Sequence, residues 1–151
     1  MIFNENKPYI FFSYPHRNNN ASRVIQVLRN DGYNVWNDEG IKHASLYDDV
    51  IASHVEGCKV FLAYITREYL ESDYCISEIK YALEKNKPIV IVLEHEKDLK
   101  LVEKYQNGLY MRISKIQALI HDRFATEDSF NRAICSTEAF NKCKINQNEI
   151  S

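Results

Sequence analysis

The chain alternates short apolar runs with stretches in which apolar residues recur every three or four positions. The runs are continuous and rich in aromatic and β-branched residues, which is typical of strands buried on both faces. The spaced stretches predict amphipathic helices between these strands. We predict strands over residues 8–14, 33–36, 58–65 and 89–93, and a fifth near residues 109–113.

Capping signals predict where the first two helices begin and end. Asn19 or Asn20 can cap the first helix, and Gly32 can close it in a left-handed conformation. Ser45 begins a capping box before the second helix, and Gly57 ends that helix.

The later helices carry similar signals. Thr66 or Ser72 can cap the third helix, and Pro88 stops it because the residue before a proline is pushed out of the helical region. A charged helix is expected over residues 99–105, and Thr126 can cap the last helix.

Strands that alternate with helices predict an α/β fold with three layers, in which helices cover both faces of a parallel sheet. We expect a five-stranded, flavodoxin-like sheet in which ligands bind beyond the carboxyl ends of strands one and three. Residues 1–143 are predicted to form a single domain, and residues 144–151 a polar C-terminal tail.

Composition limits the possible partners. With 151 residues, of which 45% are hydrophobic, the chain is long enough to bury a core of its own. Its net charge of -2 gives no basic surface of the kind that binds nucleic acid. Its apolar runs are too short to span a bilayer. We therefore expect neither nucleic acid nor a membrane among its partners.

The cysteines and histidines form no recognisable site in the sequence. The four cysteines lie in no CxxC or zinc-type spacing, and with no signal peptide they are expected to be reduced thiols in a cytoplasmic protein. The histidines have neither an i, i+4 partner nor a nearby cysteine pair, so no metal site is expected.

Glu78 lies at the edge of an apolar stripe on the helix after the third strand. Cys75, Ile79 and Ala82 belong to that stripe, and Glu78 falls roughly 100° from its centre. A glutamate at this edge can be partly desolvated and still face a cleft. If Ser72 caps the helix, the carboxylate lies within roughly 10 Å of the helix start, beside the expected crevice. The alternative is a rim residue in an ordinary surface ion pair.

Three separated stretches resemble the Toll/interleukin-1 receptor (TIR) domain family. Residues 10–14 resemble its first box, residues 32–38 resemble its second strand and the following loop, and residues 72–78 resemble the serine, aromatic, cysteine and glutamate pattern of its enzymatic branch. The resemblance covers residues 8–94 and implies a flavodoxin-like sheet in the order 2-1-3-4-5. The loop glycine that usually precedes the second helix is replaced by Ala44.

Many members of the TIR family cleave NAD+ at the nicotinamide-ribose bond, with a glutamate that matches Glu78. The resemblance therefore implies that Glu78 is catalytic and that NAD+ is a substrate, with no separate cofactor. The aspartate after the second strand of the family matches either Asn37 or Asp38, depending on a one-residue gap.

Side-chain chemistry adds candidates for binding. Tyr14 or Trp36 can stack on the nicotinamide or the adenine, and Arg17 can meet the pyrophosphate. The alternatives are a core position for Trp36 and a solvated loop charge for Arg17. The expected substrate-binding residues are Ser13, Tyr14, Arg17, Trp36, Asn37, Asp38, Ser45, Tyr74 and Cys75.

One carboxylate is enough for this reaction. Ordinary glycosides usually need a second carboxyl group to protonate the leaving group. Nicotinamide already carries a positive charge and leaves as a neutral molecule, so the remaining task is to stabilise the positive charge that grows on the ribose. Water as the nucleophile gives ADP-ribose, whereas a group of the same molecule gives a cyclic ADP-ribose isomer.

The resemblance also implies a biological setting. A TIR chain without an attached sensor or killing domain resembles bacterial antiphage signalling proteins of the Thoeris-like type, whose product activates a separate effector. Many relatives complete their site only when chains self-associate, with the loop after strand two reaching a neighbour. We expect the same TIR-TIR contacts here.

Two other functions compete with NAD+ cleavage as interpretations of this sequence. A receiver domain shares this fold class but needs an aspartate at the end of strand three, where this chain has Tyr64, Ile65 and Thr66. The remaining alternative is a non-enzymatic TIR module, an adaptor or interference factor, which would keep the fold without requiring Glu78.

Overall fold

A five-stranded parallel sheet forms the centre of the protein. The computed structural model describes residues 3–37, 44–105 and 108–143, with the backbone alone described at 44–48 and 142–143. The strand order is β2-β1-β3-β4-β5, and every neighbouring pair is parallel. The strands are β1 (Ile10–Ser13), β2 (Val35–Trp36), β3 (Val60–Ile65), β4 (Ile89–Leu93) and β5 (Ala118–Ile120). The predicted fold class and strand order are confirmed.

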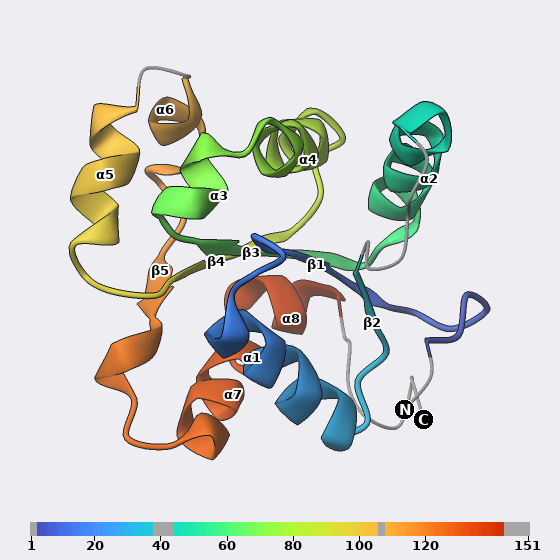
Figure 1. Cartoon of the computed structure of the whole chain (residues 1–151). Helices are drawn as coiled ribbons and strands as arrows, with labels where there is room; N and C mark the ends of the chain where they lie inside the picture. The colour runs from blue at the N-terminus through green and yellow to red at the C-terminus, as the bar shows by residue number, and fades with distance from the viewer. Residues whose placement is uncertain (1–2, 38–43, 106–107, 144–151) are drawn as a thin grey trace.

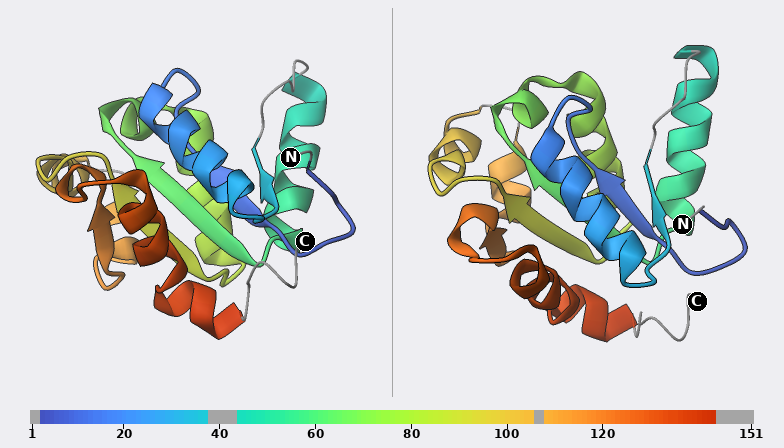
Figure 2. Two further views of the ribbon diagram at one scale, coloured as in Figure 1. Left: turned by 90° about the horizontal axis from the view of Figure 1, so that it is seen from below. Right: turned by 60° about the horizontal axis from the view of Figure 1, so that its bottom comes forward.

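Helices cover both faces of this sheet (Figure 1). One face carries α2 (Ala44–Gly57), α3 (Arg67–Glu71), α4 (Asp73–Glu84), α5 (Asp98–Lys104) and α6 (Leu109–Ile113). The other face carries α1 (Asn19–Asn30), α7 (Glu127–Cys135) and α8 (Glu138–Cys143), and the 3-10 turn η1 (His121–Arg123) joins β5 to α7. Figure 2 shows the sheet between these two layers.

The strands are buried on both sides, as their continuous apolar runs predict. Every residue of β1, β3 and β4 is buried. Phe11 and Phe61 pack under α2 to α6, whereas Ile10 and Phe12 pack against α1, α7 and α8. Successive side chains of a strand point to opposite faces, so one short run supplies both cores.

Side-chain caps define the helix starts that flank the carboxyl ends of the strands. Asn18, one residue before the predicted caps, accepts a hydrogen bond from the amide of Ala21 and begins α1. Thr66 and Ser72 each cap a helix of their own, α3 and α4, because the predicted single helix is two. Thr126 caps α7 as predicted.

The predicted fifth strand near residues 109–113 is wrong. This segment is helix α6, in which Leu109 and Ile113 are buried one turn apart and Met111 is 82% exposed. That spacing suits a helical turn, in which residues four apart share a face. The fifth strand is Ala118–Ile120, three half-buried residues that pair with β4.

Candidate active site

Glu78 is buried beneath the carboxyl end of the sheet. Ser72 caps α4, and Cys75, Ile79 and Ala82 turn the helix toward the core. Glu78 is only 4% exposed, deeper than the stripe-edge position predicted from the sequence. Burying a carboxylate is costly unless hydrogen-bond donors compensate for the lost water.

Ser13 supplies one of those donors. It is the last residue of β1 and is buried, and its hydroxyl donates to Glu78 Oε1 at 2.6 Å. This distance is in the short range of hydrogen bonds to charged acceptors. The structure therefore brings together two of the predicted site residues, one from a strand and one from a helix.

Tyr69 extends this contact and was missed by the sequence analysis. Its hydroxyl lies 2.8 Å from Ser13 Oγ, and the side chain is fully buried on α3. Because Ser13 donates its proton to Glu78, Tyr69 donates to Ser13. Burial, followed by the nearby Cys75 and Glu78, raises the pKa of Tyr69 well above its usual range, so the phenol keeps its proton.

A cleft of about 520 Å³ lies beside this buried group. Such a volume is within the usual range for a small-molecule site. Tyr14 follows Ser13 in the chain and Cys75 lies one turn before Glu78, so the cleft reaches the residues next to the carboxylate. Its described lining is Tyr14, Pro15, His16, Arg17, Asn18, Glu68, Ser72, Tyr74, Cys75 and Glu94.

Four of the predicted binding residues therefore line the cleft: Tyr14, Arg17, Tyr74 and Cys75. Tyr74 is 55% exposed, so much of its ring is accessible from solvent. The β1–α1 segment and the start of α4 bring these residues together.

Glu94 and Asn18 form a second polar contact that the sequence analysis missed. Glu94 directly follows β4, and its Oε2 accepts a hydrogen bond of 2.7 Å from the amide of Asn18. The same Asn18 side chain caps α1 through its oxygen, which fixes the direction of its amide. His95 lies 3.1 Å from the other oxygen of Glu94. In the sequence, the only sign of this contact is the polar run of three asparagines at residues 18–20.

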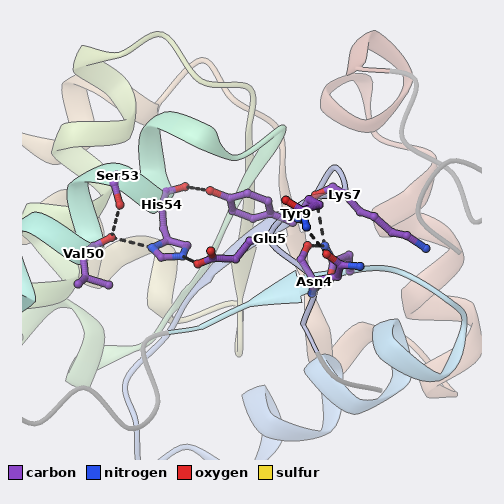
Figure 3. Close-up of polar contacts among 9 residues, drawn as sticks. Asn4, Glu5, Lys7, Tyr9, Val50, Ser53 and His54 are labelled. Atoms are coloured by element: carbon purple, nitrogen blue, oxygen red, sulfur yellow. Dashed lines mark hydrogen bonds and ion pairs between the residues drawn. The ribbon is translucent and has the colours of Figure 1, made fainter.

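Trp36 lies in the core, which was the predicted alternative to stacking on the substrate. It is 8% exposed, and its ring packs against Phe11 and stacks on His54, with ring centroids 4.1 Å apart in the latter pair. His54 is itself held between Val50 O and Glu5, as Figure 3 shows. The indole is thus built into the packing between β2 and α2.

The remaining predicted residues lie near the loop after β2. Asn37 is half-buried directly after Trp36. Asp38 lies outside the described residues, and Ser45 is described only as part of the α2 backbone. The predicted tail, residues 144–151, also lies outside the described part of the chain.

The parallel 2-1-3-4-5 sheet, with helices on both faces, defines a flavodoxin-like α/β protein. More narrowly, the chain belongs to the TIR domain family, because a family model described as TIR domain matches residues 10–134. No curated protein matches the sequence. No helix in the described residues is long and apolar enough to cross a membrane.

Among the solved structures that share this fold, two are similar to the chain at low sequence identity. The CMP N-glycosidase BcmB of Clostridium botulinum is 14% identical with a TM-score of 0.56, covering 83% of this chain and 96% of that chain. The TIR domains of the activated Roq1 resistosome, which directly recognises the pathogen effector XopQ, are also 14% identical with a TM-score of 0.56. That match covers 92% of this chain and 85% of the other.

Proposed function

We propose that this TIR domain is an NAD+ glycohydrolase or cyclase that breaks the nicotinamide-ribose bond. The observation that carries the proposal is the buried Glu78, fixed by Ser13 at the carboxyl end of β1 and next to a cleft of about 520 Å³. A buried carboxylate that is held in place and adjoins a cleft is typical of a functional group.

In this mechanism, the nicotinamide-ribose end of NAD+ enters the cleft and contacts Glu78. Nicotinamide leaves as a neutral molecule, and the carboxylate stabilises the positive charge that develops on the ribose. Ser13 and Tyr69 hold the carboxylate in one orientation, so little reorganisation is needed during the reaction. No cofactor takes part.

The cleft residues would position the substrate. Tyr14, Tyr74 and Cys75 offer apolar surface to the leaving base, and Arg17 offers a cation to a phosphate. Roles in binding for Trp36, Asn37, Asp38 and Ser45 stay predictions.

The test is to incubate purified protein with NAD+ and to measure nicotinamide release and the products by mass spectrometry. Glu78→Gln should lower kcat by a factor of about 100 or more, since it removes the charge that the transition state needs. Ser53→Ala, an exposed change on α2, is the control. Equal release by the Glu78→Gln protein and the wild type would refute the proposal. Mass spectrometry also separates ADP-ribose from a cyclic isomer.

A second candidate is cleavage of a mononucleotide. It is favoured by the structural similarity to a protein described as a CMP N-glycosidase. The same Glu78 chemistry would then act on a cytosine-ribose bond, but cytosine is not a cationic leaving group and would need a proton donor. Release of cytosine from CMP, measured beside nicotinamide release from NAD+, separates the two activities.

The proposed biological role follows the family resemblance. The product would act as a signal for a separate effector in bacterial antiphage defence, and TIR-TIR contacts would complete the site. The structural similarity to TIR domains described as part of a resistosome supports the proposal that chains assemble.

A further inference from the structure

A second groove adjoins the cleft on the side of β4. It has a volume of about 420 Å³ and runs between α3 and α5, which are in contact on the same face of the sheet (Figure 1). Glu68 and Glu94 line both hollows, so the groove continues the cleft. Its described lining is Thr66, Arg67, Glu68, Glu94, His95, Lys97, Asp98, Lys100, Leu101 and Lys104. We name it the lysine groove.

Cations line one wall of the lysine groove. Lys97 directly precedes α5, and Lys100 and Lys104 follow it at spacings of three and four positions, so the three lysines share a helix face. Arg67 comes from α3 on the opposite wall. Among the described residues, none of these four side chains forms an ion pair, and all four are exposed.

Two of the three carboxylates that line the lysine groove are engaged by the protein, and the third, that of Glu68, is exposed. Glu94 contacts Asn18 and His95. Asp98 is buried and accepts a hydrogen bond of 2.9 Å from the amide of His95. The hydrogen-bond capacity that faces solvent in the groove is therefore mainly that of its cations.

The cleft has the opposite charge balance. Among its described lining residues, Arg17 is the only lysine or arginine, whereas Glu68 and Glu94 line it and Glu78 lies beside it. NAD+ has the same polarity, because its pyridinium is cationic and its diphosphate is anionic. The two hollows match the two ends of one dinucleotide.

We infer that the lysine groove binds the diphosphate and adenosine end of the substrate while the nicotinamide-ribose end occupies the cleft. This inference rests on the proposed function and extends it to the substrate class. The groove would favour dinucleotides, because a mononucleotide held in the cleft leaves the α5 lysines without a phosphate partner. Point charges such as lysines bind phosphate well.

The test uses ADP as a probe of the anionic end and measures its binding by isothermal titration calorimetry. The double charge reversal Lys100→Glu with Lys104→Glu should weaken ADP binding at least about tenfold, and should raise KM for NAD+ more than it lowers kcat. The matched control reverses Lys115 and Arg132, two exposed cations outside the groove. It should leave ADP binding within about twofold.

Folding and function are checked separately. Circular dichroism and a thermal melt show whether the reversed protein is folded, and the milder pair Lys100→Gln with Lys104→Gln should still weaken ADP binding. Wild-type protein that does not bind ADP, or folded variants that bind it as tightly as the wild type, would overturn the inference. If ADP binding depends on the lysines but NAD+ is not cleaved, the proposed function fails and the anion site stands.

Discussion

Replacing Ser13 by alanine tests whether the buried contact to Glu78 is as important as its geometry suggests. The change removes the donor to Glu78 at 2.6 Å and the acceptor from Tyr69 at 2.8 Å. Ser13 is 1% exposed and Tyr69 0%, so water does not readily replace either bond.

The expected cost follows from these two bonds. A hydrogen bond to a charged group contributes about 1.5–3 kcal/mol and a neutral one about 0.5–1.5 kcal/mol. Losing both should lower the free energy of unfolding by about 2–4.5 kcal/mol. The domain should still fold, since domains of this size typically have about 5–15 kcal/mol of stability.

Urea denaturation measures this change. The chain has one tryptophan, Trp36, which is buried beside Phe11, so its fluorescence follows the unfolding of the core. Ser53→Ala on the exposed side of α2 is the matched control and should change stability by less than about 0.5 kcal/mol.

A double-mutant cycle gives a sharper result. Ser13→Ala and Tyr69→Phe remove the same hydrogen bond from either side, so their effects should fall short of additivity by about 0.5–1.5 kcal/mol. A loss no larger than that of Ser53→Ala, together with full additivity in the cycle, would refute the reasoning.

Three further predictions concern packing, pH and assembly. Gly57→Ala should lower the free energy of unfolding, measured by urea denaturation, by about 1–3 kcal/mol, because the new Cβ would lie 2.6 Å from the hydroxyl of Tyr9, which donates to His54 O. Adding Tyr9→Phe to the same chain should recover part of that loss. Simple additivity of the two changes would contradict the clash. The hydrogen bond to Asp122 raises the pKa of His95, so this contact should stabilise the fold below about pH 6.5 and fade as the pH rises through the folded-state value. Because the His95 side chain is 43% exposed, Asp122→Asn should lower the free energy of unfolding by only a few tenths of a kcal/mol. The loss should be larger at about pH 6 than at about pH 8.5. A loss that grows with pH would show that Asp122 does not stabilise the protonated form of His95. If chains must assemble to complete the site, the rate of NAD+ cleavage per chain should rise with protein concentration. A rate per chain that stays constant as the concentration changes would argue for an active monomer.

Local signals in the sequence predict much of the fold because they act within a few residues. The apolar runs of β3 and β4 are buried along their whole length, and Thr126 caps α7 as predicted. The three TIR-like stretches also predict the family that the match over residues 10–134 confirms. These features depend on periodicity and on hydrogen bonds between near neighbours.

The sequence failed where the local signal was short or ambiguous. The five residues from Leu109 to Ile113 suit either a strand or one helical turn, and in the structure they form a helix whose first and last side chains are buried. The true β5 has three half-buried residues at the sheet edge, and its pairing with β4 is what makes it a strand. The pattern of apolar residues within such short segments does not distinguish a strand from a helical turn.

The candidate active site shows the same division between what local sequence signals predict and what long-range packing decides. Glu78 and Ser13 were each predictable as candidates from the resemblance, but their hydrogen bond joins residues 65 positions apart. Tyr69 lies 56 positions from Ser13, and only the packing of α3 against the sheet brings the two hydroxyl groups together. Local signals placed Ser13 near the end of β1 and Glu78 on a capped helix that follows β3. The packing of the whole chain brought them together with Tyr69, removed their water and left them to bond to each other, because burial is a property of the whole fold.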